Sequence, residues 1–350
     1  MRSWINKGFI LFFAALSVLV RLASVYAGGI WSWLSILTLA LWGILAINLL
    51  LFLVQLFTKK KWKAVIPLGA ILLHTDYLYA VCQVIPNPSE AEDGIPLTLI
   101  TYNTSHFYWE KQYTLKEASA CIGKYQPDIL CLQEAPGETY YHQDSVRQAF
   151  GYLKYHCSSF RTDHSPLAIY SRYPIVSVKE AYYIDSWNMS LIADIRIADR
   201  YIRVISNHLE TTSVNAYRGI ITAPDKSWRI RMKAAKDLMW KLADNNRKRA
   251  LQADYIRHQI DRSPYPVIVC GDFNDTPASY VYHRLKGDLV DGFRECGRGY
   301  RYTFRQLCRL WRIDYILHAK GFTGTASVSP DWPYSDHNPV IWTGKIKFLP

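Results

Sequence analysis

Four short apolar runs in this 350-residue chain each end in an acid, amide or imidazole side chain, and this repetition constrains the fold more than any other feature. The runs cover residues 97–101, 129–132, 203–206 and 267–270. They are followed in turn by Tyr102-Asn103, Gln133-Glu134, Asn207-His208 and Gly271-Asp272-Phe273-Asn274. Runs of this length and composition predict buried β-strands. A sandwich of such strands would hold the polar residues rigidly at one rim.

Other patterns along the chain indicate strands mixed with helices. Further strand-like runs occur at residues 168–171, 175–178, 191–197, 201–206, 312–317 and 340–343. Helical periodicity is clearest over residues 227–260, and shorter helices are expected near 115–125 and 279–285. Hairpin-like strand pairs mixed with helices predict an α+β sandwich.

The first 85 residues have a different composition, because apolar residues crowd into 8–27, 31–57 and 65–85. Crossing a bilayer takes about 20 apolar residues, so we predict a membrane region over residues 1–85 with three transmembrane helices. The first stretch has an alternative interpretation as a signal peptide, since Arg2 and Lys7 precede it and Val25-Tyr26-Ala27 resembles a cleavage site.

Positive charges orient these predicted spans. Arg2 and Lys7 precede the first span, and four lysines follow the second within residues 59–63. The positive-inside rule then places the N-terminus and the lysine loop in the cytoplasm, and residues after 86 outside it. His74 and Asp76 weaken the third span, because an ionisable group at the bilayer centre costs at least ~2.5 kcal/mol. A re-entrant segment there would leave the remainder of the chain in the cytoplasm.

A polar, proline-bearing linker is predicted over residues 86–94, followed by one globular domain over 95–350. The net charge of +12 suits nucleic acid, anionic lipid headgroups or small phosphorylated molecules, and does not choose among them. The seven cysteines show no CxxC or Cys/His spacing typical of a zinc site.

The polar strand endings have the side chains that phosphoester hydrolysis needs: ligands for a hard cation, a base for water, and donors for the phosphate oxygens. Glu134 is the best candidate metal ligand, and Asn103 is suited to complete the metal shell or to bind phosphate. Oxygen ligands favour Mg²⁺, with Mn²⁺ or Ca²⁺ as alternatives.

The remaining candidates would act on water and phosphate. Asp272 is suited to orient or deprotonate the attacking water, and Asn274 to bind phosphate or hold Asp272. An imidazolium at His337, oriented by Asp314, would neutralise the developing charge, while His208 donates from the opposite side. Arg172 is a further candidate for substrate binding, although an arginine in Ser171-Arg172-Tyr173-Pro174 would also serve to hold a turn.

The ordered set of motifs, completed by Ser335-Asp336-His337, resembles the endonuclease/exonuclease/phosphatase superfamily over residues 97–343. The resemblance implies a four-layer α/β/β/α sandwich with its site at one edge of the sheets. It covers Asp336 and the other seven candidates apart from Arg172, and it implies that Asp336 joins the metal shell or supports it. The whole chain also resembles bacterial membrane proteins with three N-terminal spans. Abasic-site endonucleases of this superfamily carry an acid two residues after the first Asn, where this chain has Ser105, so a DNA-repair role is disfavoured.

These patterns together predict a membrane-anchored, metal-dependent phosphodiesterase or nuclease-like hydrolase of the bacterial inner membrane, with an extracytoplasmic catalytic domain. Its partners would be the lipid bilayer and a phosphoester substrate: nucleic acid, phospholipid headgroup or small phosphorylated molecule. No obligate protein partner is indicated. The alternative is a non-catalytic receptor or scaffold that binds a phosphorylated ligand in the same cleft.

Overall fold

The computed structural model describes residues 2–84, 93–159, 164–212 and 214–347, without the side chains of residues 2–6 and 215. These residues form two compact units, each built from separate stretches of sequence. The helical unit comprises residues 1–79, 211–253 and 275–284, and the sandwich unit comprises 80–210, 254–274 and 285–350. The predicted domain boundary at 85–95 remains a prediction, and most of the predicted linker lies outside the described residues.

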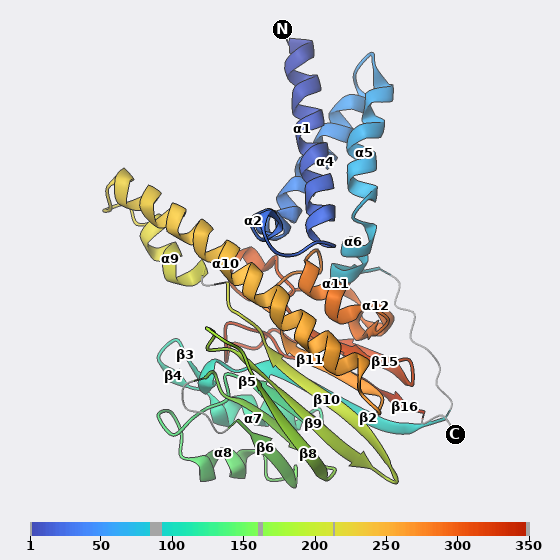
Figure 1. The fold of residues 1–350 in the computed structure, drawn as a ribbon, viewed down its shortest axis with the longest axis vertical. Helices are drawn as coiled ribbons and strands as arrows, with labels where there is room; N and C mark the ends of the chain where they lie inside the picture. Colours follow the sequence, from blue (N-terminus) through green and yellow to red (C-terminus); the bar gives the residue numbers. More distant parts are fainter. Residues whose placement is uncertain (1, 85–92, 160–163, 213, 348–350) are drawn as a thin grey trace. The chain divides into compact units, whose positions relative to one another are not determined.

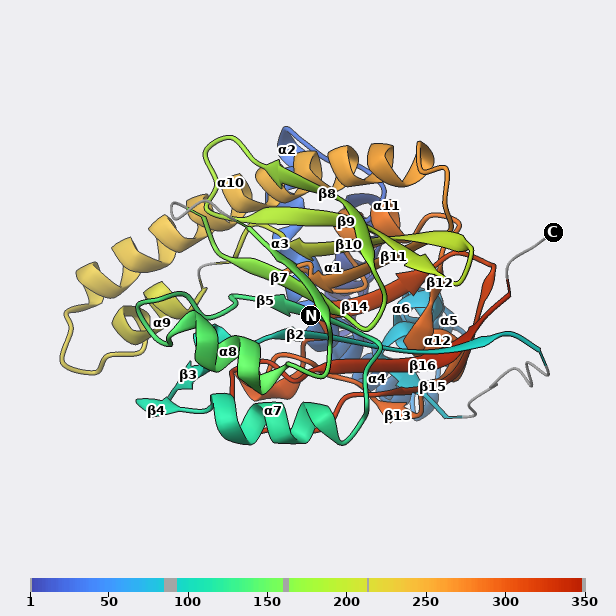
Figure 2. The ribbon, with the colours of Figure 1, turned by 90° about the horizontal axis from the view of Figure 1, so that it is seen from below.

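Two six-stranded sheets make up the sandwich unit (Figures 1 and 2). The first sheet has the strand order β12 (Val290–Asp291), β14 (Asp314–His318), β11 (Val267–Asp272), β10 (Arg200–His208), β9 (Met189–Ile197) and β8 (Ile175–Tyr182). The second has the order β15 (Phe322–Val328), β16 (Val340–Ile346), β2 (Ile95–Asn103), β5 (Ile129–Gln133), β7 (Leu167–Ser171) and β6 (Tyr155–Ser158). Most neighbours are antiparallel, but β2 with β5 and β10 with β11 are parallel. Two short pairs complete the strands of the unit: β1 (Cys82–Gln83) with β13 (Gly299–Tyr300), and β3 (Tyr108–Trp109) with β4 (Gln112–Tyr113).

The main core lies between the two sheets. Along β2, Leu97 and Leu99 belong to this core, whereas Ile100 and Tyr102 belong to a second core with the helices. This alternation follows from the two-residue period of a strand, which sends successive side chains to opposite faces. Ile268 and Cys270 of β11 enter the main core from the opposite sheet.

Helices cover the outer faces of both sheets. Helices α7 (Leu115–Gly123) and α8 (Gln143–Ala149) pack on the outer face of the second sheet through Leu115, Ile122 and Val146. On the first sheet, the end of α10 (Trp228–Asp261) contacts β8, where Lys179 Nζ donates to Gln259 Oε1 over 3.0 Å. Figure 2 shows these layers in order, so the predicted α/β/β/α sandwich is confirmed. Short helix α12 (Gly292–Cys296) completes the unit.

The observed elements agree with the sequence pattern where that pattern is long. Helix α10 occupies the stretch predicted as 227–260, and α11 (Tyr280–Lys286) occupies 279–285. The four strands that end in polar residues are all present and run one to three residues further at their ends. Strands β6 and β15 and helix α8 were not predicted, because their sequences show no sustained apolar periodicity.

The helical unit contains the N-terminal helices together with α9 and much of α10. Its N-terminal elements are α1 (Arg2–Ala23), α2 (Ile30–Leu34), α3 (Ile36–Leu39), α4 (Leu41–Leu56), α5 (Val65–Leu72) and α6 (Thr75–Val81), and α9 covers Val214–Ile221. The ionisable residues of the third predicted span have partners on α1. His74 Nε2 lies 3.0 Å from the carbonyl of Ser17, and Asp76 pairs with Arg21 at 2.6 Å.

The three uninterrupted spans expected from the sequence are not seen in the described residues. No single helix there is both long and apolar enough to cross a membrane. Two bent pairs reach that length and composition only when each is taken together: Ile30–Leu39 with Leu41–Leu56, bent by 66°, and Lys61–Leu72 with Thr75–Val81, bent by 53°. The first break lies at Ala40 and the second at residues 73–74, next to the polar sequence His74-Thr75-Asp76.

Candidate active site

Four strand ends meet at one rim of the sandwich unit, and they carry most of the predicted site residues. The parallel pairing of β2 with β5 sets Asn103 beside Gln133, next to Glu134. The parallel pairing of β10 with β11 sets His208 beside Asp272, and antiparallel β14 sets Asp314 on the other side of Asp272. Parallel strands bring their carboxyl ends to the same edge, which explains why residues far apart in sequence converge here.

The backbone at this rim adopts conformations that few residues tolerate. Gly271 has φ of 117°, and a Cβ at this position would collide with the backbone oxygen of Asn207 on β10. Glu134 and Asn274 both have positive φ, at 47° and 52°. Asn occupies this left-handed region comparatively easily, whereas Glu does so at a cost of about 1 kcal/mol or more. Glu134 therefore holds a strained position that turns its side chain off the end of β5.

An amide joins the two carboxylates on one side of the site. Asn103 Nδ2 donates to Asp272 Oδ2 over 3.0 Å and to Glu134 Oε1 over 3.3 Å. Asp272 is also held by Asn274, whose backbone N–H donates to Oδ1 over 2.8 Å. The side chain of Asp272 is buried, whereas that of Glu134 is 30% exposed. Glu134 is thus the carboxylate of this pair that is open to solvent.

His208 faces the same two carboxylates from β10. Its Nε2 lies 3.6 Å from Glu134 Oε1 and 3.8 Å from Asp272 Oδ2, and its Nδ1 lies 3.0 Å from Ser165 Oγ. Burial lowers the pKa of His208, although Glu134 opposes the shift, so the ring is neutral near pH 7. We place its single proton on Nε2, which faces the carboxylates, while Nδ1 accepts from the Ser165 hydroxyl.

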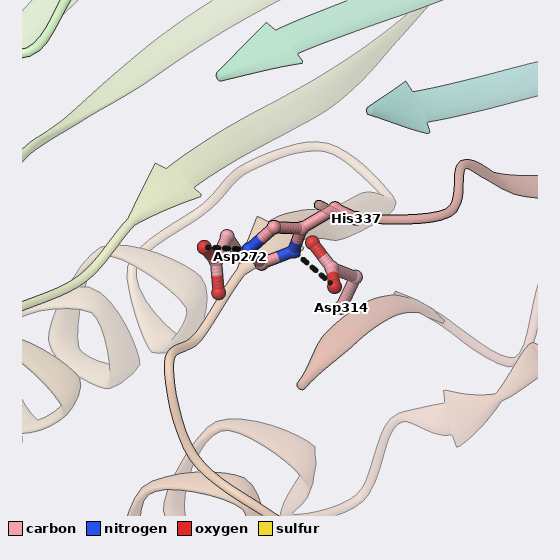
Figure 3. Close-up of side chains that lie close together, drawn as sticks. All are labelled: Asp272, Asp314 and His337. Carbon is pink, nitrogen blue, oxygen red and sulfur yellow. Dashed lines mark hydrogen bonds and ion pairs between the residues drawn. The ribbon is translucent and has the colours of Figure 1, made fainter. Parts of the chain in front are cut away.

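His337 lies between two buried aspartates (Figure 3). Its Nδ1 is 2.9 Å from Asp314 Oδ2, and its Nε2 is 3.7 Å from Asp272 Oδ2. Burial alone would lower the pKa of His337, but the Asp314 and Asp272 carboxylates outweigh it and raise that pKa well above its usual value. His337 is therefore an imidazolium, and Phe304 packs against the ring edge-to-face with 5.2 Å between centroids.

Burial also shifts the carboxyl groups of the site. It raises the pKa of Asp272 to about 7, an effect that Asp314 strengthens and His337 opposes. It raises the pKa of Asp336 too, and the neighbouring Glu134 carboxylate adds to that shift. A carboxyl group with a pKa near neutrality is suited to exchange protons with water.

The oxygen ligands fit a hard divalent cation on the Glu134 side of the site. Two carboxylates there share a single amide donor, and Asp336 adds a third carboxylate close enough to interact with Glu134. Asp272, Asp314 and His337 form another group with ligand atoms within 4.8 Å of one another. We disfavour that group as the cation site, because His337 already bonds to Asp314 and is protonated. Asp314 Oδ1 accepts no hydrogen bond from the described residues, which leaves negative charge facing the imidazolium.

Arg172 does not belong to this constellation. Strand β7 runs antiparallel to β5, so Leu167 lies beside Gln133 at the rim and Ser171 lies beside Ile129 at the opposite end. Arg172 follows Ser171, and its guanidinium pairs with Asp128 at 3.1 Å. Arg172 thus lies at the end of the sheet opposite the other candidate residues, and its role in substrate binding stays a prediction.

Sequence reasoning missed two residues that hold the site together. Ser165 contacts His208 from a loop with no recognisable pattern. Thr303 Oγ1 accepts from the backbone N–H groups of Ile313 and Asp314 at the start of β14. Ser335, part of a recognised motif, donates to the carbonyl of Asn103 over 2.8 Å and so ties the His337 loop to β2.

Aromatic side chains lie on both sides of the rim. His106, whose backbone N–H donates to the carbonyl of Glu134, stacks on Tyr140 with 4.8 Å between centroids and 6° between planes. Tyr108 continues the stack on Tyr140 at 5.6 Å. On the other side, Trp311 stacks on Phe304, which contacts His337. Aromatic residues from two separate loops thus contact the site residues directly.

The family model described as the endonuclease/exonuclease/phosphatase family matches residues 100–337, which is more than half of the chain. The chain belongs to this family. The matched region extends from just before Asn103 to His337 and so includes every strand end that forms the site. Members of this family are often phosphoester hydrolases that use divalent metals.

Individual relatives within the family are distant. Protein angel homolog 2 from Mus musculus is 26% identical over 260 residues, covering 61% of this chain and 42% of the relative, and the Homo sapiens protein is similar. The chain thus spans about two fifths of the length of these curated relatives. Crystal structures of D. rerio TDP2, one of them complexed with single strand DNA product, match with a TM-score of 0.52 at 15–16% identity. They cover 71% of this chain and 99% of theirs, which confirms the fold.

Proposed function

We propose that this protein is a membrane-anchored, divalent-metal-dependent phosphoester hydrolase, of phosphodiesterase or nuclease-like type, in which water attacks phosphorus in line with the leaving oxygen. The observation that carries the proposal is the convergence of three carboxylates, one neutral imidazole and one imidazolium at one rim of the sandwich, where each imidazole lies 2.9–3.8 Å from two carboxylates. No purely structural role requires two buried aspartates to face a buried histidine from both sides.

Each side chain has a distinct part in this mechanism. Asp272 Oδ2 accepts a proton from the attacking water, and Asn103 and Asn274 hold that carboxylate in place. The imidazolium of His337 offsets the negative charge that grows on the non-bridging phosphate oxygens, and Asp314 keeps it charged and oriented. His208 donates from Nε2 to another phosphate oxygen. A divalent cation held by Glu134, with Asn103 and Asp336, would supply Lewis-acid stabilisation of the phosphate charge.

The reaction needs only water and the phosphoester as reactants. The oxygen of water bonds to phosphorus while the bond from phosphorus to the leaving oxygen breaks. Asp272 takes one proton of the water and the leaving oxygen takes a proton from solvent, so a diester gives a phosphomonoester and an alcohol, and a monoester gives phosphate and an alcohol. Raising the pKa of Asp272 to about 7 makes its carboxylate a stronger base than an exposed aspartate while leaving it substantially ionised in neutral solution.

The flanking aromatic rings favour a substrate with a planar group next to the phosphate. Rings such as His106 and Tyr140 present faces on which a nucleobase can stack. The structural relative TDP2 has been crystallised with single strand DNA product, which supports including nucleic acids among the first substrates tested. Phospholipid headgroups and small phosphorylated molecules remain the other candidate substrates.

Hydrolysis by the full-length protein, purified in detergent, tests the proposal. Single-stranded DNA, RNA, phospholipid and inositol-phosphate substrates should be assayed with Mg²⁺, with Mn²⁺ and with chelator. We expect turnover that disappears with chelator and in Asp272→Asn. The matched control Asp261→Asn removes a carboxylate that pairs with Arg257 on the surface, and should leave turnover intact. Tight binding of a phosphorylated ligand without turnover under any metal would favour the non-catalytic receptor instead.

We also propose that the apolar helices anchor the protein in the bacterial inner membrane, with the sandwich unit outside the cytoplasm. Support comes from the apolar composition of residues 8–85, the lysines at 59–63, and the partners that His74 and Asp76 find on α1. A C-terminal alkaline phosphatase fusion should be active and a C-terminal green fluorescent protein fusion dark. The reverse pattern would place the site in the cytoplasm.

A further inference from the structure

In the helical unit, the segment that follows β10 in sequence forms an arm. This arm is rich in lysine and arginine and carries a line of exposed apolar side chains. The arm, defined as residues 214–241, consists of α9, a short connection and the first part of α10, and both views show α9 alongside that part of α10 (Figures 1 and 2). Arg231 Nε donates to the carbonyl of Ile221 over 2.8 Å and joins the two helices. The mechanism proposed above uses no residue of this arm.

The exposed side of α10 carries a stripe of large apolar side chains. Trp228, Met232 and Met239 are 71%, 46% and 43% exposed. Positions 232 and 239 lie four and eleven residues after position 228, so all three lie on one side of a helix with 3.6 residues per turn. Exposing three such side chains in one line is unfavourable in water, which indicates that this side of the helix contacts an apolar medium.

Cations border the apolar stripe. Arg229, Lys233 and Lys236 are exposed, and none of the three forms an ion pair with any other described residue. The whole arm contains seven lysine and arginine residues against two aspartates, a net charge of +5. An apolar stripe flanked by lysine and arginine is the pattern of a helix that lies in the plane of an anionic membrane surface.

The arm packs against the turn between the first two apolar helices. Trp240, at the end of the stripe, contacts Trp33 of α2 edge-to-face with 4.5 Å between centroids. Six residues further along α10, Asn246 donates to the carbonyl of Ser32 over 3.0 Å. Tryptophan is enriched where membrane helices leave the hydrocarbon region, so the contact between Trp33 and Trp240 fixes the end of the stripe at a level typical of the headgroups.

From these observations we infer that the arm is a second membrane contact, which inserts its apolar stripe between anionic phospholipid headgroups and holds their phosphates with its cations. This assignment goes beyond the proposed catalytic function and does not depend on it, but it rests on the proposed anchoring of the apolar helices in the membrane. A nucleic-acid phosphate backbone would use the cations but would leave the methionines in water, so the lipid surface accounts for more of the arm.

Hydrogen–deuterium exchange of the full-length protein tests the inference. Peptides within residues 214–241 are compared in nanodiscs of phosphatidylcholine alone and of phosphatidylcholine with phosphatidylglycerol. We expect slower exchange with phosphatidylglycerol. A cation near an anionic surface contributes about fivefold in binding, so the triple substitution Arg229→Gln, Lys233→Gln and Lys236→Gln should reduce the protection by up to about 100-fold.

A matched control removes the same charge elsewhere. The triple substitution Lys124→Gln, Lys154→Gln and Lys320→Gln neutralises three exposed lysines of the sandwich unit and should leave protection of the arm unchanged. Equal loss of protection in both triple variants would overturn the inference, because net charge alone would then explain the effect. So would equal exchange in the two kinds of nanodisc, or equal protection by single-stranded DNA in phosphatidylcholine nanodiscs.

Photo-crosslinking locates the stripe independently. Benzoylphenylalanine in place of Met232 should form lipid adducts in nanodiscs that contain phosphatidylglycerol. The same group in place of Asp237, which is exposed on the opposite side of α10, should form none. Lipid adducts at neither position would show that this side of the helix does not enter the membrane. Equal adducts at both positions would show that the stripe is not the side that inserts, and would also overturn the inference.

Discussion

Replacing Asp314 by asparagine tests whether the Asp314 carboxylate keeps His337 charged. The amide has almost the same size as the carboxylate, and its oxygen can still accept from His337 Nδ1, where the bond is now 2.9 Å long. The substitution therefore removes the negative charge and leaves the geometry. Both side chains are at most 6% exposed, so solvent does not screen the pair.

The size of the effect follows from the distance and the burial. Opposite charges centred about 4 Å apart attract by about 4 kcal/mol at an effective dielectric constant of about 20. At 1.36 kcal/mol per pKa unit, Asp314→Asn should lower the pKa of His337 by about 3. If the imidazolium offsets charge in the transition state, the same energy corresponds to a fall in kcat of about 10³-fold.

NMR titration of the histidine Cε1–H resonance, assigned with His337→Gln, measures this pKa in the full-length protein without any knowledge of the substrate. Asp261→Asn serves as the control, since it removes a carboxylate from the surface pair with Arg257. A His337 pKa that changes by less than about 1 in Asp314→Asn would refute the electrostatic reasoning. An unchanged kcat together with the expected fall in pKa would instead refute the role of the imidazolium.

Three further outcomes follow from the structure. Glu134→Gly and Glu134→Ala should both abolish hydrolysis, but Glu134→Gly should be more stable than Glu134→Ala to thermal unfolding by about 1 kcal/mol, because φ at this position is 47°. Equal melting temperatures of the two variants would contradict the backbone strain. Arg312 forms two hydrogen bonds with the buried carboxylate of Asp291, so Arg312→Met should cost about 3–5 kcal/mol in urea unfolding, and Asp291→Asn in the same chain should restore part of it. Asp272 should make metal-free protein less stable as pH rises from about 4 to about 7, because its folded-state pKa lies above its unfolded value. Thermal unfolding of wild type and Asp272→Asn isolates this effect, since the substitution should gain stability relative to wild type over that range; an unchanged difference between the two would contradict it, and Mg²⁺ should stabilise wild type more at pH 8 than at pH 5.

The sequence predicted the rim well because strand endings are local signals. An apolar run that stops at Asn103 or Asp272 marks both the strand and the residue that its end presents. The sequence placed Glu134 and His208 at one rim, but the parallel pairing of β2 with β5 and of β10 with β11 was not predicted. The expected orienting role of Asp314 also corresponds to its observed contact with His337.

Long-range relations were not predictable in the same way. Arg172 follows an apolar strand just as the site residues do, but its strand runs in the opposite direction, and nothing in a single run reveals direction. Ser165 lies in a loop without a pattern. The breaks at Ala40 and near His74 interrupt stretches that are apolar throughout, so hydropathy alone gives no signal for the bends.

The way the chain alternates between its two units limits how the gene can be divided. The chain leaves the sandwich unit after Glu210, two residues beyond His208, and again after Asn274, two residues beyond Asp272. A truncated protein that begins at β2 would retain 211–253 and 275–284 but lose the helices they pack against. It would leave Asn246 and Thr276 without the carbonyls of Ser32 and Thr38 that now accept their hydrogen bonds. Separate expression of the sandwich unit therefore requires new partners for residues 211–253 and 275–284, and a different starting codon alone does not provide them.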